Sequence, residues 1–273
     1  MQAASRESYK VAADRLDEYA RGAEPSAVST AADDILSVAA LLRREPRLRR
    51  ALSDPARSGS DRAGLLGEML RGKIGADALD LLASLVSGRW SAPSELLDGA
   101  ERLGIEALLA SADKAGELGE VEDELFRFGQ VVSGSPELSN ALSDQMAPAG
   151  QRATLADQLL DGKARPITGY LVGAALAGFG GRSFTGALTR LVELAADRRD
   201  RQVAYVTVAA PLSDEEERRL GARLSQMYGR EVSVKQTVNP DVLGGVSVRV
   251  GSDLYDGTVL RRLNETRNAL AKR

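Results

Sequence analysis

The sequence contains neither cysteine nor histidine, and aromatic residues make up only 4% of its 273 positions. The two missing residue types exclude disulfides, thiolate nucleophiles, imidazole bases and the usual zinc and haem ligands. Carboxylates could still hold magnesium, but no Asp or Glu cluster has the spacing of a loop site. We therefore predict no catalytic residue, no cofactor-binding residue and no metal site.

An excess of charge of either sign is also missing. The 36 basic and 39 acidic residues give a net charge of -3, which argues against a protein whose surface must meet nucleic-acid phosphates. Two groups of arginines stand out, and we interpret both as solvated helix faces. They are Arg43, Arg44, Arg47, Arg49 and Arg50 in the first group, and Arg198, Arg199 and Arg201 in the second.

Long apolar segments are absent as well. The longest weakly polar segment, residues 170–181, falls short of the roughly 20 residues that cross a bilayer. The first 21 residues carry charges throughout, unlike a secretory signal. We expect no direct membrane insertion.

What the sequence does contain is an internal duplication. Residues 45–73 return ninety positions later as residues 135–163, and twelve of the twenty-nine positions are identical without a gap. A period of this length exceeds the roughly 20 to 50 residues of solenoid units. We interpret it as a duplicated helical domain.

Helical periodicity dominates the first two hundred residues. Apolar stripes predict helices over residues 9–20, 35–42, 60–70 and 77–86 of the first copy. From Ser94 the helical spacing continues to Gly116. This segment covers both the end of the first copy and the start of the second, so one long helix or two abutting helices should join the copies stiffly. Abundant alanine suits close helix packing.

After Asp200 the period changes to two. Strands are expected over residues 203–208, 232–238 and 246–250. Between the first two, Ser213 and Glu216 form a capping box, and the helix that they start should end at Gly229. A last helix is expected from Thr258. The predicted fold is mostly α: two tandem helical bundles (residues 1–104 and 105–200) and a small α/β domain (201–273) in the order strand, helix, strand, strand, helix.

Three motifs suggest other chemistry. Gly67, Gly72 and Lys73 fit the spacing of a phosphate loop, but Ile74 lacks a hydroxyl for magnesium and no strand precedes them, so we favour a helix C-terminus. The glycines of residues 178–181 are interpreted as an interhelix turn. Asn264 begins a glycosylation sequon inside the expected last helix, which we attribute to chance. For Trp90 we favour packing.

The C-terminal segment supplies the most specific motif. Residues 238–251 read Val-Asn-Pro-Asp-Val-Leu-Gly-Gly-Val-Ser-Val-Arg-Val-Gly, and Leu-Tyr-Asp-Gly-Thr-Val follows. Gly244 and Gly245 permit a bulge or a close backbone approach, and Asp256, Gly257 and Thr258 form a turn and a cap. This pattern resembles the delta subunit of bacterial F-type ATP synthases, a family that includes the mitochondrial oligomycin-sensitivity-conferring protein.

The resemblance covers about the last 170 residues and also includes residues 108–196, where Leu118, Val121, Glu124, Leu125 and Phe128 lie in the early helices. An ordinary member has one helical bundle, so this chain resembles a long, actinobacterial-type form. The resemblance leaves open which copy keeps the binding role of the family.

The resemblance implies a non-catalytic peripheral-stalk subunit of the proton-translocating synthase, at the cytoplasmic face of the cell membrane. A helical bundle would bind the N-terminal helices of the alpha subunits, and the C-terminal domain would bind the b subunit. Two alternatives are a generic helical adaptor and a nucleotide-binding enzyme that uses residues 67–73.

Overall fold

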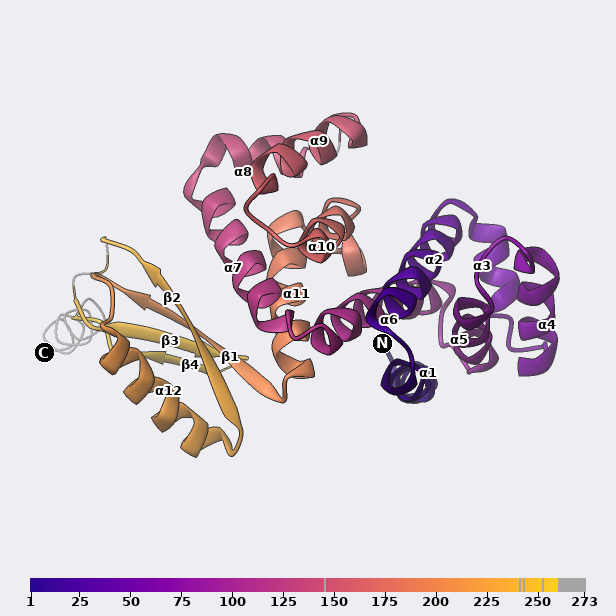
Figure 1. Cartoon of the computed structure of the whole chain (residues 1–273), viewed down its shortest axis with the longest axis horizontal. Helices are drawn as coiled ribbons and strands as arrows, with labels where there is room; N and C mark the ends of the chain where they lie inside the picture. Colours follow the sequence, from indigo (N-terminus) through magenta and orange to yellow (C-terminus); the bar gives the residue numbers. More distant parts are fainter. Residues whose placement is uncertain (145, 241, 243, 252, 260–273) are drawn as a thin grey trace, which may run out of the picture.

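The computed structural model describes residues 1–259 except 145, 241, 243 and 252. Three parts follow one another along the long axis of the molecule: a first helical bundle, a second helical bundle and a C-terminal α/β domain (Figure 1). The expected last helix, including the sequon at Asn264, lies outside the described residues apart from its first positions.

Eleven α-helices build the two bundles within the described residues. The first bundle contains α1 (Ala3–Gly22), α2 (Pro25–Arg44), α3 (Pro46–Leu52), α4 (Gly59–Leu70), α5 (Ala76–Ser87) and α6 (Pro93–Lys114). The second contains α7 (Leu118–Gly134), α8 (Pro136–Ser143), α9 (Ala149–Leu160), α10 (Pro166–Leu176), the short 3₁₀ turn η1 (Phe179–Gly181) and α11 (Phe184–Arg198).

The duplication is visible in both the elements and their contacts. Helices α2 to α5 and α7 to α10 follow each other at the same spacing of ninety residues. Asp34 on α2 accepts a hydrogen bond from the Gly75 N–H ahead of α5, at 2.7 Å. Glu124 on α7 accepts one from the Arg165 N–H ahead of α10, at 2.9 Å. Each carboxylate thus satisfies an N–H at the start of a helix, where negative charge is favoured.

Helix α6 belongs to both bundles. It packs against α1 and α2 on one side and against α10 and α11 on the other, so it completes the first bundle and opens the second. It is a single helix of 22 residues that ends before Gly116, whose φ of 73° only glycine adopts readily. Of the two arrangements expected here, one long helix or two abutting helices, the structure shows the first, and the stiffness of the connection stays a prediction. The expected domain boundary at residue 104 falls inside this helix and stays a prediction.

The two bundles share one continuous hydrophobic core, whereas the C-terminal domain has a core of its own. Helix α2 is long and apolar enough to cross a membrane by length and composition alone. Its buried side chains, among them Val28, Ile35 and Leu42, pack inside the first bundle. A core helix of a bundle has the same composition, because it must be apolar along its packed face.

The C-terminal domain is a four-stranded sheet with a helix on one face. The strands are β1 (Arg201–Val208), β2 (Glu231–Val238), β3 (Val246–Val250) and β4 (Asp253–Asp256), in the order β2-β1-β3-β4. β1 pairs parallel with β2 through α12 (Asp214–Tyr228), and β3 pairs antiparallel with both β1 and β4. Sequence analysis missed β4, because its four residues are too short to show a period of two.

The two faces of β1 serve different neighbours. Ala204, Val206 and Val208 pack in the core beneath α12, while Val203 belongs to the core of the bundles and Tyr205 packs against it. The sheet therefore lies between α12 and the second bundle. This alternation follows from the period of two, which sends successive side chains to opposite faces.

The glycine motif and the capping box have the expected structural roles. Gly245 has a φ of 85°, and a Cβ there would lie 2.5 Å from the carbonyl oxygen of Gly257. The two segments that flank β3 and β4 can approach only because Gly245 has no side chain. At α12, Glu216 accepts from the Ser213 N–H at 2.9 Å and donates its own N–H to the Ser213 hydroxyl at 3.3 Å. Gly229 ends the helix in the left-handed conformation.

Candidate docking surfaces

Residues 67–73 do not form a phosphate loop. Helix α4 runs through Gly67 to Leu70, and Gly72 takes a φ of 75° immediately after the helix. A phosphate loop needs backbone N–H groups that are free of helix hydrogen bonds. The Arg71 N–H instead donates to Gly67 O at 3.0 Å, so this segment is a helix C-terminus and the nucleotide-enzyme alternative loses its site.

The other singled-out residues are also structural. Trp90 is 7% exposed, and its Nε1–H donates to Leu85 O at 3.0 Å. Gly178, Gly180 and Gly181 form the left-handed turn between α10 and α11. Among the described residues, no group of three acidic side chains could hold a metal ion. The surfaces that remain are suited to binding other chains.

An apolar cleft of about 390 Å³ lies where the two bundles meet. Three helices line this cleft. They contribute Leu36 and Ala40 from α2, Ile105 from α6, and Tyr170 and Ala174 from α10. Tyr170 is 53% exposed, although tyrosine side chains are more often partly or largely buried. The cleft thus presents apolar surface that no described residue covers.

Charged groups also line this cleft. Glu101 of α6 is 6% exposed and joins the two bundles: Oε1 accepts from Arg43 Nη2 at 2.6 Å, and Oε2 accepts from the Gly180 N–H at 3.0 Å. Arg44 stands beside the cleft, exposed, and makes no ion pair with any residue that the structure describes. The open rim therefore carries an unpaired positive charge.

The corresponding surface of the first bundle is different. There α1 and α5 are bridged by polar contacts, with Arg15 Nη2 2.7 Å from Asp80 Oδ2 and the Tyr19 hydroxyl 3.1 Å from Asp77 Oδ2. Asp80 stands ninety residues before Tyr170, so a charged residue replaces the exposed aromatic ring. The groove between α6 and α10 of the second copy is thus apolar, whereas its counterpart between α1 and α5 is bridged by polar side chains.

A second cleft, of about 1090 Å³, opens between the second bundle and the sheet. Small residues of α7, Gly129, Ser133 and Gly134, line one side, and Tyr205 and Arg249 line the other. Arg249 is the only charged residue among those that line it; its guanidinium lies 4.7 Å from the centre of the Tyr205 ring. Burial, followed by the charge of Glu193, raises the pKa of Tyr205, so its hydroxyl stays protonated.

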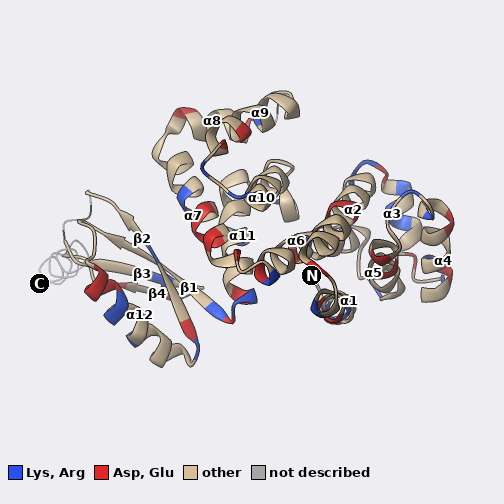
Figure 2. Ribbon diagram, viewed as in Figure 1, with Lys and Arg blue, Asp and Glu red and all other residues tan. Residues whose placement is uncertain are grey.

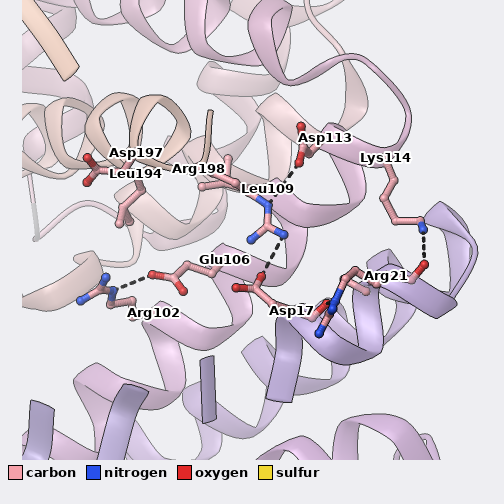
Figure 3. A pocket seen from close by; sticks show the side chains of 11 residues that line it. Asp17, Arg21, Arg102, Glu106, Leu109, Asp113, Lys114, Leu194, Asp197 and Arg198 are labelled. Atoms are coloured by element: carbon pink, nitrogen blue, oxygen red, sulfur yellow. Dashed lines mark hydrogen bonds and ion pairs between the residues drawn. The ribbon is translucent and has the colours of Figure 1, made fainter. Parts of the chain in front are cut away.

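A third hollow, of about 620 Å³, lies between α1, α6 and α11 (Figure 3). Its four basic and four acidic side chains are partly paired: Arg102 Nε is 2.8 Å from Glu106 Oε1, and Arg198 Nη2 is 3.0 Å from Asp17 Oδ1. Because these charges balance, the hollow does not favour a ligand of either sign. The ion pair of Arg198 and Asp17 instead connects α1, the first helix of the bundles, with α11, the last.

The arginine clusters only partly match the expectation of solvated faces. Arg44, Arg47 and Arg50 are exposed, as predicted. For Arg198 and Arg199 the prediction was wrong, because their side chains are 20% and 27% exposed and pair with carboxylates of other helices. The reason is tertiary: those carboxylates are far away in sequence. In the view of Figure 2, both basic and acidic residues occur in each of the two bundles and in the described part of the C-terminal domain.

Contacts between α7 and β2 hold the C-terminal domain. Glu122 is fully buried and accepts from Arg199 Nη1 at 3.0 Å, Ser233 Oγ at 2.9 Å and Lys235 Nζ at 2.8 Å. Lys235 also lies 2.5 Å from Asp123 Oδ1. Sequence analysis did not single out Glu122, Ser233 or Lys235, since nothing local distinguishes Glu122 from the acidic residues beside it.

Comparison with known proteins agrees with this architecture. The family model "ATP synthase delta (OSCP) subunit" matches residues 106–270, more than half of the chain. The chain is 80% identical to "ATP synthase subunit delta" of Salinispora arenicola and to that of Salinispora tropica, over all of both proteins in each case. It is 44% identical to the protein of that name from Streptomyces griseus, with 99% of this chain and all of the relative covered.

Proposed function

Because the chain belongs to the ATP synthase delta (OSCP) subunit family, we propose that it ties the alpha subunits of the catalytic head to the b subunit of the stalk through two separate docking surfaces. As a family member it is a non-catalytic component of the peripheral stalk of the F-type ATP synthase, a membrane-associated complex that couples proton transport to ATP synthesis. A generic helical adaptor is therefore the wrong description. We place the subunit at the cytoplasmic face of the cell membrane.

The cleft between α2, α6 and α10 is the proposed site for an alpha N-terminal helix. Its exposed apolar lining is the main observation in support of this proposal. Its apolar walls and exposed Tyr170 suit the apolar stripe of an amphipathic helix, the groove-binding mode in which residues at i, i+3, i+4 and i+7 serve as anchors. The unpaired Arg44 at the rim favours a helix with an acidic residue at that end. The second copy thus takes the binding role.

The first copy contributes to the same site. Leu36 and Ala40 of α2 belong to the first bundle, so a chain with a single bundle would lack this wall of the cleft. The duplication therefore converts a groove between two helices into a channel between three. More apolar surface is buried per bound helix, which slows its dissociation.

The C-terminal domain is the proposed site for the b subunit. The cleft between α7 and the sheet has the size of a docking groove, and Gly129, Ser133 and Gly134 let a helix approach the α7 backbone closely. With Arg249 as the one charged residue in its lining, the cleft suits a largely neutral helix face. Two attachments in series, each of slow dissociation, would let the stalk resist the torque of the rotor.

Co-purification with alpha and b subunits tests this proposal. Ala174→Arg places a charge in the apolar cleft and should reduce binding of an alpha N-terminal peptide at least tenfold while b binding is kept. The matched control is Ser84→Arg, at the position ninety residues earlier on α5, which should leave both affinities unchanged. Equal loss of alpha binding in the two variants would contradict the assignment to the second copy.

A further inference from the structure

We propose that the buried ion network between α7, α11 and β2 fixes the orientation of the C-terminal domain on the second bundle, with Glu122 as the positioning residue. The two docking surfaces then move as one body rather than about a hinge. This inference concerns the isolated chain and does not depend on which partner occupies either surface.

The surroundings of Glu122 hold its carboxylate in one position. Its side chain is 0% exposed, and three donors from two parts of the chain surround its carboxylate. Arg199 reaches it from the end of α11, whereas Ser233 and Lys235 reach it from β2. A buried carboxylate is stable only while such donors remain in place. Sliding the sheet along α7 would leave the carboxylate of Glu122 buried without its donors, which is energetically costly.

Lys235 depends on the contact in the same way. Its side chain is 7% exposed, and its ammonium group lies between Glu122 on one side and Asp123 on the other, at 2.8 and 2.5 Å. The ring of Phe126 lies 6.0 Å from the same nitrogen. Two carboxylates and two cations balance within the network, so it carries no net charge that would push the domains apart.

Further contacts along α7 are directional too. Gln130 lies on α7 about two turns after Glu122. Its Nε2 donates to Gln236 O at 2.7 Å and to Thr237 Oγ1 at 3.1 Å, both on the same strand as Lys235. Apolar contacts also lie in the interface, where the rings of Phe126 and Tyr205 are 6.3 Å apart and Val203 joins the core of the bundles. Hydrogen bonds specify one register, whereas apolar contacts alone permit sliding.

The first bundle shows what the network replaces. The position ninety residues before Glu122 is Ala32, which is 0% exposed and packs in the core. The register is secure, because Asp34 and Glu124 make equivalent hydrogen bonds in the two copies. At this position of the repeat, a buried carboxylate therefore occurs only in the copy that meets the sheet, which links Glu122 to the attachment of the C-terminal domain rather than to the stability of the bundle.

A distance measurement between the domains tests the proposal. Because the chain has no cysteine, Gln151→Cys on α9 and Ala222→Cys on α12 give one spin label on each side of the network. Both positions are exposed, and no described hydrogen bond or ion pair uses either side chain. Pulsed electron paramagnetic resonance on the full-length chain then reports the distribution of distances between the labels.

We expect one narrow distribution in the parent chain and a distribution at least twice as wide in Glu122→Ala and in Lys235→Met. Lys235→Met removes the charge but retains an unbranched side chain. It provides the test if Glu122→Ala does not fold. The control Asp33→Ala removes the carboxylate ninety residues before Asp123 and should leave the width unchanged. Unchanged widths in both network variants, or a parent distribution as wide as theirs, would overturn the proposal.

The same variants separate this inference from the proposed function. The isolated alpha peptide should bind Glu122→Ala and Lys235→Met with parent affinity, because neither side chain lines the apolar cleft and that cleft lies entirely within the two bundles. If the parent chain does not bind the isolated alpha and b peptides, the proposed docking sites are refuted, and the result of the distance measurement is unaffected.

Discussion

Arg62 and Arg152 stand ninety residues apart and make the same hydrogen bond in the two bundles. Arg62 Nε donates to Val86 O at 2.9 Å, and Arg152 Nη1 donates to Leu176 O at 3.2 Å, each at the end of the helix that follows. The duplication has thus preserved a guanidinium that satisfies carbonyl groups at a helix C-terminus, where cations are favoured.

The two arginines should differ in their contribution to stability. Arg62 is 4% exposed and donates to the carbonyl oxygens of five residues, whereas Arg152 is half-buried and donates to one. We expect Arg62→Met to lower the free energy of unfolding by about 2 to 4 kcal/mol and Arg152→Met by about 1 kcal/mol. Urea unfolding measured by circular dichroism gives both values. Equal losses would show that the extra hydrogen bonds of Arg62 add nothing.

Gly99 should resist the substitution that usually stabilises a helix. A Cβ at this position of α6 would lie 2.5 Å from the Trp90 ring. We expect Gly99→Ala to cost about 1 to 3 kcal/mol through overpacking. Gly64→Ala on the exposed side of α4, where nothing lies within 4 Å, should instead add about 0.5 to 1 kcal/mol. Thermal unfolding compares the pair, and stabilisation by both would contradict the contact with Trp90.

Gly245 should be indispensable to the C-terminal domain. Alanine there meets both the positive φ and the overlap with Gly257 O, so we expect a loss of about 2 to 4 kcal/mol. Gly229→Asn is the matched control, because it shares the positive φ but has open space around it and Asn accepts that conformation. Hydrogen exchange of the β1 and β3 amides measures the effect. Similar protection in both variants would mean that the close approach is unimportant.

The capping box of α12 should make this helix sensitive to acid. The backbone N–H of Ser213, and then its hydroxyl, hold the pKa of Glu216 below its ordinary value of 4.5. A carboxylate with a lowered folded pKa stabilises the fold above its unfolded pKa, and this stabilisation is lost as the pH falls through the folded pKa. Protection of the first α12 amides should therefore decrease between about pH 5 and about pH 3. Glu216→Gln should remove most of that pH dependence.

Local sequence patterns predicted most of the secondary structure, because helix and strand periods, caps and glycine turns act over a few residues. The run from Ser94 to Gly116 predicted α6, and Ser213 with Glu216 predicted the start of α12. The predicted start of the helix at residue 60 was one residue late, because Ser58, with Asp61, caps α4 and the helix begins at Gly59. The exposed Tyr170 and the buried Glu122 could not be distinguished from their neighbours, since helical periodicity does not reveal which side another domain covers.

By itself the sequence determined that helices come first, that their unit is duplicated, and that a sheet with a glycine-dependent turn follows; all of these depend on short-range sterics and hydrogen bonding. Tertiary structure alone decided that α6 serves both bundles, that α2 forms a wall of the apolar cleft, and that Glu122 is buried against a strand 111 residues away. Burial of a charge is decided by partners distant in the chain, and these meet only when the whole molecule folds.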